Sequence, residues 1–199
     1  MATYTVAITG ASGAPYARRL LQVLIKGGHS IYVTISGEGL SILNDEADLL
    51  LKGSDTDIQN ALEKHFEAKG GQIAYFGEDY MYAPIASGSV MVDAMVVIPC
   101  SMKTLASIAN GYASNLAERA ADVMLKEKRK LIIVPRETPL SAIHLRNMLT
   151  LAELGCHVLP AMPAFYHHPK LVSDMVDFIV GRVLDSMGIE NDLTTRWGI

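Results

Sequence analysis

The sequence has few cysteines, and they form no pattern that would hold zinc. Only Cys100 and Cys156 occur in the 199 residues. They do not form a CxxC pair, and no His/Cys cluster has the spacing of zinc ligands. This excludes a disulfide framework and a classical zinc site. A reduced, cytosolic environment is therefore the simpler expectation.

Charge and long apolar runs are also scarce. Charged residues make up 19% of the chain and its net charge is −4, so it lacks the broad basic face that nucleic-acid binding needs. No uninterrupted apolar run is long enough to span a membrane. The first ten residues lack the charged region and long apolar run of a signal peptide. We expect a cytoplasmic protein that binds neither nucleic acid nor membrane.

Hydrophobic residues are plentiful, at 50%, and they fall into segments typical of alternating strands and helices. The predicted strands are residues 3–9, 30–36, 72–76, 94–99, 131–135 and a sixth that ends at 160. Helical patterns separate them, including one over 38–68 that breaks near 52–55, and a final helix follows 172. This alternation predicts an α/β protein with one parallel sheet covered on both faces. Without a repeat or linker, residues 1–199 are predicted to form a single domain.

A glycine-rich turn, residues 10–15 (GASGAP), follows the first predicted strand. Its glycines permit a tight turn and a close approach by a ligand, as in mononucleotide-binding units. The turn is not a full GxGxxG motif. The second strand ends in Ser36-Gly37 without the acidic residue that would hold an NAD ribose, although Glu38 is close. The pattern favours a phosphate-bearing mononucleotide over a dinucleotide, and glycines needed only for packing remain an alternative.

The central stretch, residues 99–145, repeats this arrangement twice. One strand runs into Ser101-Met102-Lys103-Thr104, the next ends at Arg136-Glu137-Thr138, and a helix follows each. Helix N-termini offer unpaired N–H groups, and ligands of open α/β sheets lie outside the carboxyl ends of the strands. We interpret these two strand ends as a place to hold phosphate.

Two cations, Arg119 and Lys126, lie seven residues apart on the helix between these strands. That spacing puts both on one helix face, roughly 10 Å apart along the axis. They are candidates for phosphate binding. The alternative is a solvated basic stripe beside Glu118, Asp122 and Glu127.

The sequence alone assigns no function to two other groups of residues. The acidic residues Asp45, Glu46 and Asp48 could suggest a cation site, but we interpret them as a solvated helix face. Tyr80, Met81 and Tyr82 lie in a loop and are exposed apolar candidates, which would cover a site or pack against another subunit.

Several motifs, taken together and in order, resemble the UbiX family of flavin prenyltransferases. They are GASG at 10–13, PCSMKTLASIANG at 99–111, the run from 115 to 149 (NLAERAADVMLKEKRKLIIVPRETPLSAIHLRNML), PAFYHHP at 163–169 and the terminal RW. Two positions depart from the family pattern. Ser114 stands where the family often has Asp, and Arg146 stands where Glu is common. We expect these changes to affect packing or assembly.

The resemblance implies a Rossmann-like, three-layer α/β/α fold around a mostly parallel six-stranded sheet. It implies reduced FMN as the bound flavin and co-substrate, and dimethylallyl phosphate as the prenyl donor. The prenyl unit would be attached at flavin N5 and C6, which adds a fourth ring. A UbiD-type decarboxylase of ubiquinone or aromatic-acid metabolism would receive the product. The protein would be a homododecamer with the flavin at subunit contacts.

The resemblance also assigns roles to residues. The FMN site would comprise Gly10, Ala11, Ser12, Ser36, Ser101, Met102, Lys103, Thr104 and Arg136. Ser12 would lie near the reacting N5 edge, and Glu137 would act as proton donor and acceptor. The prenyl phosphate would be bound by Glu137, Tyr166 and Arg182, with contributions from Arg119 and Lys126. Trp197 would help to close the aromatic pocket.

The chemistry of prenyl transfer suits these residue types. Breaking an allylic C–O bond leaves phosphate, which cationic donors stabilise, and an allyl cation, which aromatic faces can stabilise. Arg119, Lys126 and Arg182 fit the first need, whereas Tyr166 and Trp197 fit the second.

Two further features bear on mechanism. A carboxylic acid at Glu137 would promote phosphate departure if burial or an anion raised its pKa, and Arg136 would oppose that shift if it points the same way. No DDxxD magnesium motif occurs, which favours a monophosphate handled without metal. Because the flavin supplies the nucleophile, Cys100 is interpreted as packing at the end of a strand.

Two other functions remain open at this level. The first is a flavin-dependent decarboxylase of the peptidyl-cysteine or phosphopantothenoylcysteine type, which shares the fold. Those enzymes carry a PASANT-like turn, whereas residues 99–104 here read PCSMKT and lack the asparagine. The second is a non-enzymatic FMN carrier, which would leave Glu137 and the second set of cations without a task.

Overall fold

The apolar segments form one six-stranded sheet in the computed structural model, which describes residues 1–196 and 198. The strands are β1 (Thr3–Ile8), β2 (Ser30–Ile35), β3 (Ile73–Gly77), β4 (Ala94–Cys100), β5 (Lys130–Pro135) and β6 (His157–Val158). Their order is β3-β2-β1-β4-β5-β6 and every pairing is parallel. The prediction of a six-stranded, mostly parallel sheet is confirmed.

Helices connect successive strands and begin where the sequence supplies a cap. They are α1 (Ala14–Lys26), α2 (Gly37–Glu46), α3 (Asp55–Phe66), α4 (Met102–Ala109), α5 (Leu116–Lys126), α6 (Ala142–Glu153) and α7 (Val172–Met187), with a short 3₁₀ helix η1 (Pro84–Ala86). In five of them a serine or asparagine side chain accepts a hydrogen bond from the first turn, which satisfies an otherwise unpaired N–H group. These caps are Ser36, Ser54, Ser101, Asn115 and Ser141.

The core consists of two apolar layers, one on each face of the sheet. On one face Tyr4, Val6 and Ile8 of β1 pack with α1, α3 and α7. On the other face Ala7 of β1 and Met95 of β4 pack with α4 and α5. Alternate residues of a strand point to opposite faces, so a strand covered on both sides is apolar throughout. All seven residues of β4 are buried for this reason.

The strand order reverses between β1 and β4. From β1 the chain builds outward through β2 and β3, and then returns to the other side of β1 to add β4, β5 and β6. The loops that follow β1 and β4 therefore leave in opposite directions, and in open α/β sheets this point, at the carboxyl ends of the strands, is where the ligand-binding crevice forms. The fold thus places the GASG turn beside the turn at Ser101.

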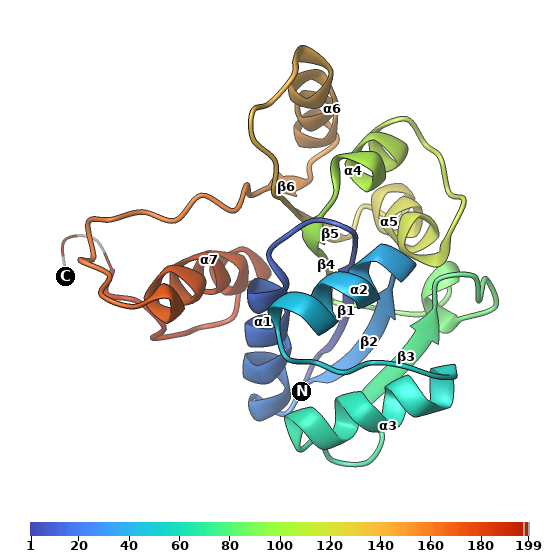
Figure 1. The fold of residues 1–199 in the computed structure, drawn as a ribbon. Helices are drawn as coiled ribbons and strands as arrows, with labels where there is room; N and C mark the ends of the chain where they lie inside the picture. The colour runs from blue at the N-terminus through green and yellow to red at the C-terminus, as the bar shows by residue number, and fades with distance from the viewer. Residues whose placement is uncertain (197, 199) are drawn as a thin grey trace.

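One helix and the C-terminal segment stand away from the sheet. Figure 1 shows α6 projecting beyond α4, and an extended segment that leads from β6 to α7 at the side of the molecule. Only two residues of α6 are buried. Its exposed apolar side chains are Ile143, Leu145, Leu149 and, just after the helix, Leu154. These side chains flank the two buried ones and have no cover among the residues that the structure describes.

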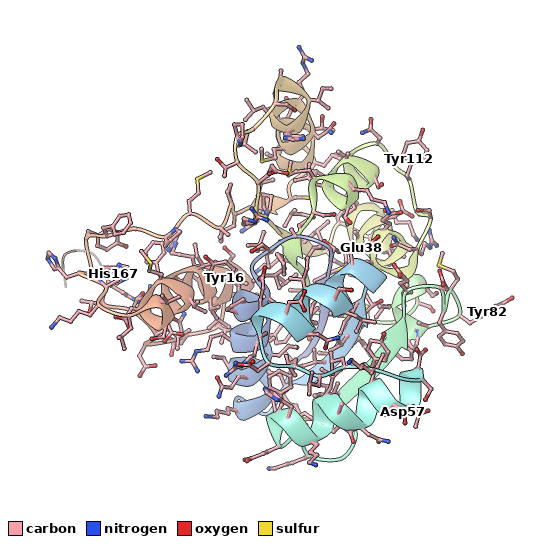
Figure 2. All side chains as sticks on the ribbon, viewed as in Figure 1. Tyr16, Glu38, Asp57, Tyr82, Tyr112 and His167 are labelled. Carbon is pink, nitrogen blue, oxygen red and sulfur yellow. The ribbon has the colours of Figure 1, made fainter. Side chains whose placement is uncertain are left out.

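The loop after β3 is also apolar at its surface. Tyr82 is 90% exposed, and Figure 2 shows its ring projecting from the edge of the molecule. Tyr80 and Met81 are exposed too, so the prediction of exposed side chains in this loop is confirmed. Tyr80 stacks on Phe76 at a ring-centroid distance of 6.1 Å, which fixes the start of the loop.

The helical pattern over 38–68 is broken, as predicted near 52–55, and forms α2 and α3. The break is longer than predicted and spans residues 47–54, where the Asn44 side chain hydrogen-bonds to the backbone of Leu51. The sixth strand differs more from its prediction. The sixth strand has only two residues, because Pro135 of β5 has no N–H group to continue the ladder on that side. Its backbone pairing continues irregularly through Leu159 N to Ile133 O at 2.8 Å and Ala161 N to Pro135 O at 3.0 Å. Within the described part of the chain, no helix is both long and apolar enough to cross a membrane.

Candidate functional site

The crevice between β1 and β4 is held together by Thr9. Its hydroxyl donates to Pro99 O at 3.0 Å and accepts from Ser101 N at 2.8 Å. Its own N–H donates to Pro99 O at 3.2 Å. Thr9 is 2% exposed, so these bonds are shielded from water. They set the GASG turn against the N-terminus of α4.

Each glycine of the GASG turn meets a specific need. Gly13 has φ 126°, a conformation that other residues rarely adopt. A Cβ on Gly10 would lie 2.6 Å from Cβ of Glu38, in the first turn of α2. Close packing therefore does require one glycine, as the alternative interpretation held. In the same turn Ser12 is exposed, whereas Ala11 is buried.

The serines at the ends of β2 and β4 are helix caps. Ser101 Oγ accepts from Thr104 N at 3.2 Å and donates to Thr104 Oγ1 at 3.0 Å. Ser36 Oγ accepts from Gly39 N at 3.0 Å. These hydroxyls and the nearby helix N-termini face the carboxyl edge of the sheet, where an anion is stabilised. Met102 is half-buried and Lys103 is exposed in the same turn.

Arg136 closes the crevice from the end of β5. Its Nε donates to Ser12 O at 3.0 Å, and its backbone N–H donates to Cys100 O at 3.4 Å. One residue thus joins the ends of β1, β4 and β5. The structure brings the predicted residues from Gly10 to Ser12, Ser36, Ser101 to Thr104 and Arg136 to this one edge.

Glu137 lines a hollow of about 400 Å³ beside Arg136, together with Leu140, Met148 and Met162. Its side chain is exposed and, among the described residues, its Oε1 accepts from the adjacent Thr138 N alone, at 2.9 Å. The burial that acid chemistry at this carboxyl calls for is therefore not supplied within one chain.

Tyr166 and Arg182 line a different hollow, of about 310 Å³, on the outer side of α7. Arg182 Nη1 lies 3.0 Å from Asp185 Oδ2. Tyr166 packs edge-on against Phe178 and His167, and Figure 2 shows His167 in the extension far from the sheet. This hollow and the hollow at Glu137 share no lining residue. The expected union of Glu137, Tyr166 and Arg182 does not occur within one chain.

Arg119 and Lys126 are also remote from Tyr166 and Arg182. They lie on α5, which packs on the opposite face of the sheet from α7. Arg119 donates to Ala86 O at 3.1 Å and pairs with Asp122 at 2.6 Å. Lys126 pairs with Glu127 at 2.7 Å. Within a single chain, Arg119 and Lys126 therefore form ion pairs at the surface, as the alternative of a solvated basic stripe predicts. Glu118 differs from that alternative because it is buried.

Two other expectations concern Trp197 and Cys100. Trp197 lies outside the described residues. Cys100 is fully buried, and burial raises the pKa of its thiol far above the ordinary value, which supports packing as its role. Among the described residues, no group of three or more His, Cys, Asp or Glu side chains is placed to hold a metal ion.

Glu46 is exposed, as its interpretation as part of a solvated helix face predicts, but its carboxylate also makes hydrogen bonds that the sequence does not reveal. Glu46 Oε2 accepts from Gly13 N at 2.8 Å and from Ala14 N at 3.1 Å, at the N-terminus of α1. Burial alone would raise the pKa of Glu46. Hydrogen bonds from Gly13, the Ser12 hydroxyl and Ala14, with the charge of Arg136, nevertheless hold this pKa below its ordinary value. The carboxylate thus occupies the anion position at the N-terminus of α1.

The fold and this crevice are those of a nucleotide-binding α/β protein. Similarity to known proteins identifies the family. The family profile described as Flavoprotein matches residues 2–184. A relative called "Flavin prenyltransferase UbiX" in Halalkalibacterium halodurans is 50% identical, over 98% of this chain and 93% of the relative. A protein of the same name in Pseudomonas aeruginosa is 47% identical over 98% and 93%. The chain therefore belongs to the UbiX family of flavin prenyltransferases.

Solved structures agree with this assignment. The crystal structure of AnUbiX (PadA1) in complex with FMN and dimethylallyl pyrophosphate has a TM-score of 0.87 at 36% identity, over 99% of this chain and 97% of that one. A dodecameric FMN-dependent Ubix-like decarboxylase from Escherichia coli O157:H7 has a TM-score of 0.85 at 43% identity, over 98% of both chains. A PPC decarboxylase mutant has a TM-score of 0.58 at 16% identity, over 81% and 83%, so it shares the fold alone.

We predict that Glu46→Gln lowers stability at neutral pH and that the difference disappears in acid. Because the pKa of Glu46 is lowered by folding, its contribution is present above the ordinary pKa of about 4.3 and is lost as pH falls through the lower, folded-state value. The partly exposed carboxylate should contribute roughly 1 kcal/mol or less at pH 7. Thermal unfolding from pH 7 to pH 3 measures this. A difference in Tm that persists at pH 3 would contradict the account.

Proposed function

We propose that the protein transfers a dimethylallyl group from dimethylallyl phosphate to reduced FMN, joining it at N5 and C6 to form prenylated FMN. The observation that carries the proposal is the crevice at the strand-order reversal, where Ser12, Ser101, Thr104 and Arg136 meet. It occurs in a chain that matches flavin prenyltransferases along nearly its whole length.

In this proposal the carboxyl edge of the sheet binds FMN. Gly10 and Ala11 allow the ring to approach the first turn, and Ser12 lies near its N5 edge. The phosphate is bound at Ser36 and the N-terminus of α4, with Ser101, Met102, Lys103 and Thr104, because Glu46 already occupies the N-terminus of α1. Arg136 is tied to Ser12 and so orders the same rim.

The second anion, the prenyl phosphate, requires residues that one chain keeps apart. We propose that Tyr166 and Arg182 of one copy face Glu137 of another, with Arg119 and Lys126 contributed by a further surface. The separate hollows at Glu137 and Arg182 support this arrangement. The exposed apolar side chains of α6 and the dodecameric state of the Escherichia coli relative support a homododecamer. The flavin then lies at contacts between copies.

The charge of each group indicates its role in the reaction. Reduced FMN supplies the nucleophile for the allyl group. Arg182, Tyr166, Arg119 and Lys126 stabilise the departing phosphate without a metal ion. Glu137, buried once neighbouring copies and ligands cover it, gives a proton to the phosphate and later accepts one from the flavin. Trp197 is assigned to the closure of the aromatic pocket.

We place the protein in the cytoplasm as a single flavoprotein domain and assign its product to a UbiD-type decarboxylase.

The test is anaerobic incubation with reduced FMN and dimethylallyl phosphate, followed by mass spectrometry of the flavin. The proposal expects a flavin heavier by one C5H8 unit. An unchanged flavin, with carbon dioxide released from a cysteine-terminated substrate, would instead establish a decarboxylase. Tight FMN binding with neither product would indicate a carrier.

We predict that Glu137→Gln keeps FMN affinity and slows prenyl transfer by roughly 10²- to 10⁴-fold, because it removes the proton donor and acceptor but not a flavin contact. Single-turnover formation of prenylated FMN measures the rate, and flavin fluorescence measures affinity. Glu67→Gln, at the exposed end of α3, is the matched control. Turnover of Glu137→Gln equal to that of Glu67→Gln would remove Glu137 from the mechanism.

A further inference from the structure

A second arginine lies in the hollow that contains Tyr166 and Arg182. Arg196, from the segment after α7, has Nη2 3.1 Å from Asp185 Oδ1. Arg182 lies on α7 and has Nη1 3.0 Å from the other oxygen, Oδ2. Two guanidinium groups from different segments therefore share one carboxylate. Together the three side chains leave one net positive charge in the hollow.

The carboxylate lies behind the two cations. The Asp185 side chain is 25% exposed, whereas the side chains of Arg182 and Arg196 are 57% and 53% exposed. Asn191 Nδ2 also donates to Asp185 Oδ1, at 3.1 Å, and so fixes the carboxylate from a third side. Asp185 thus orients both guanidinium groups from the side away from the hollow, and their outer edges face the hollow.

Most donors of the two arginines are not used by the protein. Each guanidinium has five N–H donors. Among the residues that the structure describes, Asp185 is the only acceptor that either Arg182 or Arg196 contacts. Thr194 and Thr195 add hydroxyl groups to the lining. Planar guanidinium edges beside hydroxyls are suited to the oxygens of a phosphate.

We propose that Arg196 binds the phosphate of the prenyl donor together with Arg182, and that Asp185 is the positioning residue for both. This inference rests on the proposed function, because it names a further contact of the same substrate. The competing role for Arg196 is a clip that only holds its segment against α7. An ion pair at this exposure contributes little to stability, so a clip alone would be weak.

The two roles predict different changes in phosphate affinity for two substitutions. If Arg196 binds phosphate, Arg196→Gln removes attraction and Asp185→Asn adds it, since the negative charge is gone while the one remaining oxygen still accepts from one of the two arginines. If Arg196 is only a clip, both substitutions loosen the same contact and weaken binding alike. Lys69→Gln removes a positive charge from the exposed turn after α3 and controls for net charge.

The experiment measures kcat and KM for dimethylallyl phosphate at saturating reduced FMN, the Kd of FMN, and binding of inorganic phosphate by calorimetry. We expect Arg196→Gln to raise KM about tenfold with kcat and the Kd of FMN unchanged. Arg196→Lys should restore part of this loss. Asp185→Asn should bind inorganic phosphate more tightly, and Lys69→Gln should match the wild type in every measured constant.

Equal weakening by Arg196→Gln and Asp185→Asn, or a normal KM in Arg196→Gln, would overturn the inference and leave the proposed function intact. A wild-type protein that forms no prenylated flavin would refute the proposed function instead. In that case the calorimetric titrations with inorganic phosphate still decide whether Arg196 binds the anion, because they do not depend on turnover.

Discussion

The arrangement of the site depends on one buried hydroxyl. Thr9 ends the first strand and bonds to Pro99 O and Ser101 N across the point where the strand order reverses. Parallel strands leave their carboxyl ends at one edge, but they do not fix the loops that follow. Thr9 fixes two of them, and Arg136 adds the third through Ser12 O. A preorganised rim of backbone and hydroxyl groups costs less to order when a flavin binds.

The single chain forms only part of the proposed reaction site. Its crevice suits a flavin, while Glu137 stays exposed and Tyr166 and Arg182 lie in a hollow of their own. Allyl transfer needs a dry site, because water would capture the cation and weaken the phosphate contacts. Contact between copies through apolar surfaces such as that of α6 would supply this dryness. The proposed chemistry and the proposed assembly therefore depend on each other.

Sequence patterns predicted the sheet well, because buried strands and capped helices are encoded locally. The GASG turn, the Ser101 cap and Arg136 were placed at one edge because each follows the carboxyl end of a predicted parallel strand. The hydrogen bonds of Glu46 were missed, since its partners Gly13 and Ala14 are more than thirty residues away and helix periodicity cannot show such contacts. The separation of Arg119 from Arg182 was also not visible. Which face of a sheet a helix covers is a property of the tertiary fold.

FMN affinity of Thr9→Val tests the central claim most directly, because valine keeps the shape and removes both hydrogen bonds. Thr34→Val is the matched control, since the Thr34 hydroxyl is buried without a hydrogen-bond partner among the described residues. The account predicts that Thr9→Val weakens FMN binding about tenfold or more while Thr34→Val leaves it unchanged. Equal, wild-type FMN affinity in both folded variants would contradict it.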